Sequence, residues 1–439
     1  MFSMNRSRGL LSGLSFALVL LSLLLDSGAV ALARSPTAVG DEFENAKRAL
    51  QGVLEQTKTA PIIRGIERIA ATADPRAVRI LAFVAHRHPE DPVHGAVDAA
   101  LISQSGESWV TALGEQLRQS PDDAAAILVI NALGKIDSPV TTGPLVTSLQ
   151  VVRVPVLVAA IRACRNKTGR ALVPALIDVL ERSEQDAGLV WAETRISLQT
   201  LTAERFLPAE DWQKWWSTRP VDWNPGSARN GEKNAKTSVY RPKDGEGAIA
   251  LPRIFGQEVA SKRVVFIIDT SQSMEAVDPT EQEEGSTQGS SRTRLQRAQK
   301  ELISAIELLR PDVRYNVIAY STEVKPWISD DLVKANKKAK GKSIGFVGSL
   351  RPNGTTSSGA ALLLAMDMPD VDTIIFLSDG SPTILGSGKI ADIAPILEEV
   401  FAKNRDKNIT IHTLGFRGAK ISFMRALANE SGGTYAPIR

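Results

Sequence analysis

Three stretches of the sequence place carboxylate and hydroxyl groups directly beside or close to apolar runs. The candidate ligands are Asp269, Ser271 and Ser273 after VVFII, Thr355 within RPNGTTSSG, and Asp379 after TIIFLS. Hard oxygen ligands, few of them charged, suit an octahedral Mg²⁺ or Mn²⁺ that keeps some water, and they do not suit zinc. The residue types therefore predict a divalent-ion site, provided that the fold brings the three stretches together.

An alternation of apolar runs and helical segments from Arg263 onward supplies such a fold. The apolar runs are VVFII, YNVIAYS, TIIFLS, ITIHTLGF and TYAPI, and VKPWIS is expected to add an antiparallel edge strand. Buried strands separated by helices predict an α/β fold with a doubly wound, mostly parallel sheet. Such sheets bind ligands at the carboxyl ends of strands, near the point where the strand order reverses, and the three stretches would lie there.

Residues 263–439 resemble the von Willebrand factor type A domain, a Rossmann-like fold. The metal-ion-dependent adhesion site of that family has an Asp-x-Ser-x-Ser run after the first strand, a Thr after a Gly in a later loop, and an Asp after the fourth strand. Those positions fall on Asp269, Ser271, Ser273, Thr355 and Asp379. The resemblance implies that the serines and the threonine approach the ion directly and that the aspartates act directly or through water. It also implies that an acidic group of a protein partner, Glu or Asp, completes the coordination.

Two features depart from the family pattern. Gln272 stands where many members have Gly, and its side chain is expected to face outward. Residues 275–291 form an acidic stretch, longer than the usual connection, between the motif and the first helix. We expect a surface loop there; the functional alternative is that it covers the metal face or contributes to the choice of partner.

Residues 41–218 consist of helical segments that recur every 15 to 17 residues, such as DDAAAILVINALGKI and GRALVPALIDVLERS. Each begins with a capping or helix-starting residue and continues with apolar residues at helical spacing. Repetition at this period predicts an all-α solenoid, and the segments resemble short HEAT-type repeats. A non-repetitive helical bundle is the alternative. Trp212, Trp215 and Trp216 are expected to cap the last repeat, and residues 219–262 to form a linker.

Residues 1–33 have the order of a secretory signal peptide. Arg6 and Arg8 precede an apolar run from Leu10 to Leu25, which ends in the small-residue pattern Ala-Leu-Ala at 31–33. We therefore expect an exported protein, periplasmic or secreted, with a retained membrane anchor as the alternative. The arrangement resembles exported bacterial proteins that combine HEAT-like repeats with a type A domain. Cys164 is the only cysteine, so no intrachain disulfide can form.

Charge and motifs argue against several other classes of function. With 52 basic and 49 acidic residues the net charge is +3, which does not provide the concentrated basic surface of a nucleic-acid binder. The sequence KGKS lacks the first glycine of a phosphate-binding loop, since Asn336 stands there, and GxSxG is absent from the predicted mature chain. A zinc site from His86, His88 and His94 is conceivable, but solvated loop histidines are commoner.

These observations predict an exported, non-enzymatic binding or adhesion protein that captures an acidic group of a protein partner through Mg²⁺ or Mn²⁺. One alternative is a structural scaffold in which the repeats bind the partner and the metal only holds three loops together. Another is a regulator of a partner ATPase, which export disfavours because ATP is scarce outside the cytoplasm. Contact with a membrane is expected only if the signal peptide remains uncleaved.

Overall fold

The computed structural model describes residues 42–88, 91–120, 122–225, 251–277, 292–384, 389–405 and 407–438. The predicted signal peptide and most of the acidic stretch lie outside them. None of the described helices is both long enough and apolar enough to span a membrane.

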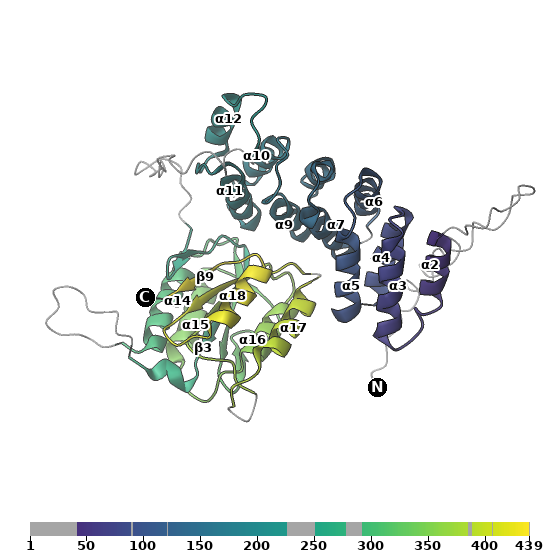
Figure 1. The fold of residues 1–439 in the computed structure, drawn as a ribbon. Coiled ribbons are helices and arrows are strands. Elements are labelled where there is room, and N and C mark those ends of the chain that lie inside the picture. The colour runs from purple at the N-terminus through teal and green to yellow at the C-terminus, as the bar shows by residue number, and fades with distance from the viewer. Residues whose placement is uncertain are drawn as a thin grey trace, which may run out of the picture.

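The N-terminal half is entirely helical, and its helices pack in consecutive pairs. Helices α3, α5, α7, α9 and α11 lie side by side in one layer, and α4, α6, α8, α10 and α12 form the second layer, so that the half is drawn out into an arc (Figure 1). The bounds are α2 Glu42–Gln51, α3 Thr59–Ala71, α4 Arg76–Arg87, α5 Asp91–Ile102, α6 Glu107–Arg118, α7 Asp123–Lys135, α8 Thr142–Ser148 after a 3₁₀ turn, α9 Val154–Ala163, α10 Leu172–Ser183, α11 Leu189–Thr202 and α12 Ala209–Ser217.

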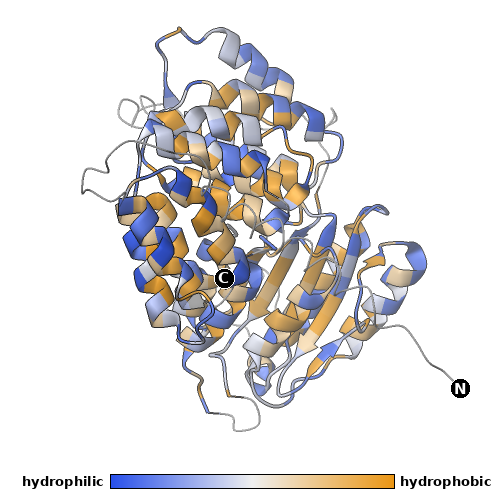
Figure 2. Cartoon of the chain, turned by 90° about the vertical axis from the view of Figure 1, so that its right-hand side faces the viewer, coloured by the Kyte–Doolittle hydropathy of each residue, from blue (hydrophilic) through white to orange (hydrophobic). Residues whose placement is uncertain are grey.

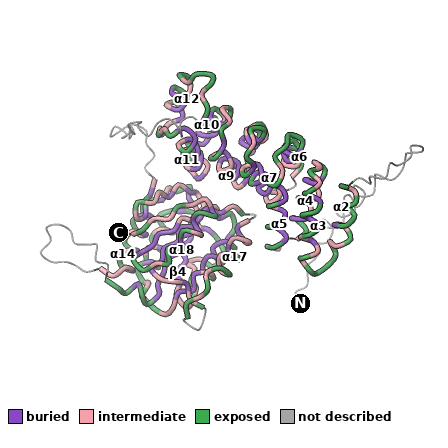
Figure 3. The backbone as a smooth tube through the Cα atoms, in the orientation of Figure 1, coloured by how far each residue is buried: buried purple, intermediate pink, exposed green. Residues whose placement is uncertain are grey.

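Local sequence explains both the starts of these helices and their packing. The side chain of Asp122 accepts a hydrogen bond from the backbone N–H of Ala125 and so caps α7. The apolar residues of α7 and α9 then join one continuous core (Figure 3). At the far end Trp212 is fully buried and meets Phe206 and Trp215 edge to face. Trp212 and Trp215 therefore belong to the core at this end of the helical half.

The C-terminal half is the predicted doubly wound sheet with helices on both faces. Strands β4, β3, β7, β8 and β9 are parallel, and β5 and β6 both pair antiparallel with β4. The bounds are β3 Arg263–Asp269, α14 Arg294–Leu308, β4 Arg314–Tyr320, β5 Val324–Pro326, β6 Val333–Lys334, α15 Lys337–Ser349, α16 Ser358–Asp367, β7 Thr373–Ser378, α17 Ile393–Asn404, β8 Thr410–Gly415, α18 Ile421–Glu430 and β9 Tyr435–Pro437.

The sheet also confirms the predicted edge strand, because VKPWIS contains β5. Within the stretch predicted as a linker, a short hairpin is formed by β1 Arg253–Ile254 and β2 Gln257–Glu258. Helix α15 was not predicted from the sequence. Its start is capped by Asn336, whose side chain accepts from the backbone N–H of Ala339.

Side chains of β3 alternate between two apolar layers, as the two-residue period of a strand requires. Phe266 points into the core under α14 and α15, and Ile267 points into the core under α16, α17 and α18. Because both faces of the strand are covered, almost every residue of β3 is buried, and Figure 2 shows the strands as an apolar band between helices. This burial on both faces fixes the position of the polar residues at the strand's end.

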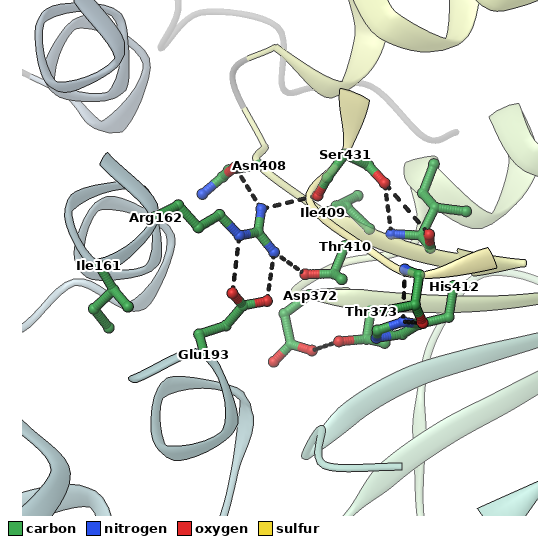
Figure 4. A network of polar contacts seen from close by, with 12 residues as sticks. Ile161, Arg162, Glu193, Asp372, Thr373, Asn408, Ile409, Thr410, His412 and Ser431 are labelled. Carbon is green, nitrogen blue, oxygen red and sulfur yellow. Dashed lines mark hydrogen bonds and ion pairs between the residues drawn. The ribbon is translucent and has the colours of Figure 1, made fainter. Parts of the chain in front are cut away.

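The helical half contacts the amino-terminal edge of the sheet through α9 and through the connection between α10 and α11. Arg162 on α9 donates to Thr410 Oγ1 at the start of β8 and to the carbonyl oxygen of Ser431 after α18 (Figure 4). A second contact joins Asp186 to Lys262, directly before β3. The two halves therefore meet at the opposite edge of the sheet from the carboxyl ends of the strands.

A buried acid anchors this interface from the helical side. The Glu193 side chain is only 3% exposed and receives both Arg162 and Arg165. Desolvation alone would raise the pKa of Glu193, but the two guanidinium groups outweigh it and hold the pKa below its ordinary value. Arg162 is thus fixed by Glu193 on one side and by the C-terminal half on the other.

Candidate functional site

The sheet topology brings two of the predicted acids together. Asp269 is the last residue of β3, and Asp379 directly follows β7, the strand that pairs with β3 in parallel. On its other side β3 pairs with β4, and Asp269 lies opposite Tyr320. These three strand ends surround the point at which the order of the sheet reverses, where such folds bind ligands.

Asp269 is completely buried and forms the floor of the site. Its Oδ1 accepts from the backbone N–H of Ser271 at 2.8 Å, and its Oδ2 accepts from Ser378 Oγ at 2.8 Å and from Tyr320 Oη at 3.1 Å. Burial raises the pKa of Asp269 to about 6, opposed by the Ser271 and Ser378 hydrogen bonds and assisted by the charge of Asp379. A nearby cation would therefore favour its ionised form.

The two serines connect the floor to the second acid. Ser271 Oγ and Ser273 Oγ are 3.0 Å apart, and Ser273 Oγ donates to Asp379 Oδ1 at 2.7 Å. Gln272 is exposed between them and its side chain contacts Glu275, so the prediction that it faces outward is confirmed. Four of the five predicted residues thus form one connected cluster.

The fifth predicted residue, Thr355, occupies the loop before α16, but its hydroxyl contacts Thr322 Oγ1 at 3.1 Å. The neighbouring Thr356 lies closer to the cluster. A Cβ at Gly380, the residue after Asp379, would be 3.4 Å from Thr356 Oγ1 and 3.7 Å from Ser273 Oγ, so both hydroxyls border the same backbone position. Sequence reasoning missed Thr356, although the repeated threonine in GTTSS was a signal that could have raised it.

Backbone hydrogen bonds join the loop after β3 to the loop before α16. Gln272 N–H donates to the carbonyl oxygen of Gly354 at 3.0 Å, and Asn353 N–H donates to that of Thr270 at 2.7 Å. Gly354 has φ +70°, and a Cβ there would lie 2.3 Å from Thr322 Oγ1. Only glycine fits this position, since it must combine a left-handed conformation with close approach.

One cation already contacts the cluster. Arg294, the first residue of α14, donates from Nη1 to Asp379 Oδ2 at 2.7 Å, and the Asp379 side chain has no exposed surface. Two buried carboxylates close to each other repel, so an adjacent positive charge stabilises the ionised pair. The sequence alone did not single out Arg294.

The donor set fits a hard divalent ion. Hydrogen bonds connect the hydroxyl oxygens of Ser271 and Ser273 with a carboxylate oxygen of Asp379, next to the buried carboxylate of Asp269. The hydroxyl oxygen of Thr356 borders Gly380, as does that of Ser273. Mg²⁺ and Mn²⁺ prefer oxygen ligands of this kind. Within the described residues no three His, Cys, Asp or Glu side chains form a metal-binding group.

The three histidines considered for zinc face different partners. His86 Nδ1 lies 3.8 Å from Asp122, His88 Nε2 contacts the carbonyl oxygen of Leu54, and His94 Nδ1 lies 3.8 Å from Asp98. In the described part of the chain, these three histidines do not form a common set of metal ligands.

Comparison with known families agrees with this topology. Residues 264–381 match the family model described as von Willebrand factor type A domain, a segment that contains all five predicted ligands. The C-terminal half contains a von Willebrand factor type A domain. An all-helical region precedes it. Type A domains are usually non-catalytic modules that bind other proteins.

Curated relatives match part of this chain. Inter-alpha-trypsin inhibitor heavy chain 4 of Mus musculus is 29% identical over 136 residues, which cover 28% of this chain and 13% of the mouse protein. The human von Willebrand factor A domain-containing protein 3A is 27% identical over 188 residues, which cover 42% of this chain and 14% of the human protein. The chain thus matches less than a fifth of each relative's length.

Solved structures of type A proteins are similar at low identity. One from Catenulispora acidiphila is 22% identical with a TM-score of 0.34, covering 42% of this chain and 40% of the other. Proximal thread matrix protein 1 from the mussel byssus, described with a zinc-occupied adhesion motif, is 17% identical with a TM-score of 0.29, covering 40% of each chain.

Proposed function

We propose that the protein is an exported, non-enzymatic binding protein. Its type A domain captures a Glu or Asp carboxylate of a protein partner through Mg²⁺ or Mn²⁺. The ion would be held by Ser271, Ser273 and Asp379 with one threonine of the 355–356 pair, and Asp269 would support it from below. When bound, the ion supplies a positive charge with an exchangeable position that an acidic group can enter.

The hydrogen bond from Ser273 to Asp379 is the observation that carries the proposal. It joins the ends of two neighbouring parallel strands through a hydroxyl and a carboxylate, at a distance of 2.7 Å. An ordinary turn after β3 would not require a buried acid from β7 to face the second serine. The pair instead gives two oxygen donors that a small ion could bind together.

The position of the helical half is compatible with this role. Its contacts with the type A domain, through Arg162 and Asp186, lie at the amino-terminal edge of the sheet. These contacts do not involve the carboxyl edge, where Ser273 is exposed. A macromolecular partner could therefore approach the proposed metal without displacing the helices.

Export is part of the proposal and rests on the signal-peptide pattern of residues 1–33. Cell fractionation followed by N-terminal sequencing of the mature chain would test it. Cleavage after Ala33 is the expected result. A chain that keeps residues 1–33 and stays in the membrane fraction would favour the anchored alternative.

A groove in the helical half supports a second candidate function, in which the repeats bind the partner. It has a volume of about 540 Å³ and is lined by residues of α2, α4 and α6. Phe43, Val78 and Phe83 supply apolar lining, and Lys47 and Arg79 supply charge. In this scaffold reading the metal would only hold the three loops together.

Metal titration of the whole mature chain tests the first requirement. We expect Mn²⁺ to bind one site and to raise the melting temperature, because a ligand that binds only the folded state stabilises it. Ser273→Ala and Asp379→Asn should abolish both effects. Thr147→Ala on α8, an exposed hydroxyl in the helical half, serves as the matched control.

Binding of acidic peptides tests the second requirement. Immobilised peptides carrying a central Glu, and the same peptides carrying Gln, would be offered to the chain in Mg²⁺ and in EDTA. The adhesion proposal expects retention only with Glu and only in Mg²⁺. Retention that survives both EDTA and Ser273→Ala would favour binding by the repeats.

A further inference from the structure

Both oxygens of the Asp379 carboxylate are occupied, and by groups of different kinds. Oδ1 accepts from the hydroxyl of Ser273 at 2.7 Å, and Oδ2 accepts from the guanidinium of Arg294 at 2.7 Å. The acid has no exposed side-chain surface, and only 17% of the Arg294 side chain is exposed. A charge-assisted bond of this kind, largely removed from water, is stronger than a surface ion pair.

The backbone around Arg294 holds the guanidinium in place. Thr293 caps α14 in a capping box with Gln296, and Arg294 N–H donates to the carbonyl oxygen of Ala276 at 2.9 Å. Val277 and Thr293 also form an antiparallel bridge. The start of α14 is therefore tied to the segment that directly follows Ser273, so the arginine and the serine are positioned by the same local structure.

An arginine at this position is unfavourable for the helix itself. The first turn of a helix carries partial positive charge from its unpaired N–H groups, and acidic residues are preferred there. Arg294 is the first residue of α14, where its charge adds to that of the helix end. The ion pair with Asp379 compensates locally, which indicates that the requirement for this cation comes from the site.

We propose that Arg294 is a resident counter-cation of the site, against which a divalent ion must compete for Asp379. This inference rests on the metal site of the proposed function. Without metal, the guanidinium balances the charge of Asp379 and keeps its oxygens oriented. When an ion binds next to Ser273 and Asp379, the like charge of Arg294 opposes it, so Arg294 lowers the affinity for the ion.

The experiment measures the Mn²⁺ dissociation constant of the whole mature chain by calorimetry and by the loss of the free-ion paramagnetic resonance signal. Arg294→Gln removes the charge and keeps a side chain that can donate to Asp379. Arg294→Lys keeps the charge. Lys300→Gln removes one positive charge from an exposed position on the same helix and is the matched control.

We expect Arg294→Gln to bind Mn²⁺ roughly tenfold more tightly than the wild type, because a like charge close to the ion is removed. Arg294→Lys and Lys300→Gln should stay within roughly threefold of the wild type. The melting temperature gives a second readout. Without metal, Arg294→Gln should melt below the wild type, and saturating Mn²⁺ should raise it by more than it raises the wild type.

The possible outcomes separate the two proposals. Equal or weaker binding by Arg294→Gln, with a wild type that binds, overturns the role of Arg294 and leaves the metal site standing. Tighter binding by Lys300→Gln to the same degree would assign the effect to overall charge and also overturn it. Failure of every variant and of the wild type to bind Mn²⁺ overturns the metal site, and the inference falls with it.

Discussion

Gly432 of the type A domain makes room for Arg162 of the helical half: a Cβ at Gly432 would lie 2.6 Å from Cζ of the arginine. The glycine has φ +74° and follows Ser431, whose carbonyl oxygen accepts from Arg162 Nη1 at 2.9 Å. The interface between the halves therefore depends on the absence of a side chain at one position as much as on the arginine that enters it.

Gly432→Ala should destabilise the chain through two effects. A left-handed conformation costs a non-glycine residue about 1–2 kcal/mol, and the displaced guanidinium would lose hydrogen bonds worth roughly 1–3 kcal/mol more. Gly256→Ala is the matched control, because Gly256 has φ +81° and nothing within 4 Å of its Cβ position. Urea unfolding would measure both variants. An equal decrease in the free energy of unfolding for Gly432→Ala and Gly256→Ala would show that the contact with Arg162 contributes nothing.

Arg162→Gln should weaken the connection between the halves. It removes one of the two partners of the buried Glu193 and the bonds to Thr410 and Ser431, for a loss of roughly 3 kcal/mol. Arg153→Gln breaks an ion pair with side chains 42% and 36% exposed and should cost less than about 1 kcal/mol.

Calorimetry provides the measurement for the arginine variants. We expect Arg162→Gln to separate the unfolding of the helical half from that of the type A domain. The lone Cys164 offers an independent readout, since it is buried in the helical half and burial raises its pKa to about 12. Its reaction with a thiol reagent should report the opening of that half only. Wild-type cooperativity in Arg162→Gln would contradict the prediction.

Thr356→Ala should lower the affinity for Mn²⁺ by at least roughly tenfold, and Thr355→Ala should change it by less than about threefold. The reason is that Thr356 Oγ1 borders Gly380 beside Ser273, and Thr355 Oγ1 contacts Thr322. The two variants control for each other, because they remove the same atoms one residue apart. The reverse order would assign the ligand to Thr355, as the family resemblance implies.

Asp372 gives a pH-dependent contribution to stability. It accepts from Ser261 Oγ and Thr373 Oγ1 next to the interface, and burial raises its pKa from 3.8 to about 6 (Figure 4). Between pH 3.8 and about pH 6, Asp372 is protonated more in the folded chain than in the unfolded chain. Its contribution to the free energy of unfolding is therefore complete below pH 4 and is lost as pH rises through 6.

As pH rises from 4 to 7, the wild type loses this contribution and Asp372→Asn does not. The free energy of unfolding of Asp372→Asn, minus that of the wild type, should therefore increase by up to about 3 kcal/mol over this range. Unfolding free energies in urea across that range would measure it. Asp370→Asn is the control, since Asp370 is exposed two residues earlier and its left-handed conformation suits asparagine. Parallel pH profiles for Asp372→Asn and the wild type would refute the assignment.

The sheet and the cluster of Asp269, Ser271, Ser273 and Asp379 could be predicted because their signals are local. Each buried strand is a continuous apolar run, and each polar residue stands at the end of one. Once parallel strands are inferred, their carboxyl ends meet at one edge without further information. The sequence does not show whether Thr355 or Thr356 faces the cluster. That depends on the backbone path of the loop, which Gly354 constrains through its left-handed conformation.

Other features could not be predicted because they depend on tertiary contacts. Helix α15 contains Gly341, Gly345 and Gly348, which lower helix propensity, and its packing on α14 helps to compensate. Arg162 is one of several arginines on the helices, and nothing in the sequence marks it as the one that faces another domain. Arg294 at a helix start would be expected to point into water.

The helical half and the candidate metal cluster lie at opposite edges of one sheet, and this placement has a mechanical consequence. A partner held at the carboxyl edge and a restraint acting on the helices would pull along the strand axes. The metal cluster follows β3 and β7, and Arg162 holds the start of β8, so β7 and β8 would be pulled from opposite ends and all the hydrogen bonds between them would share the force at once. Parallel strands loaded in this direction cannot open one bond after another, so the sheet would transmit tension between the two attachments rather than unzip.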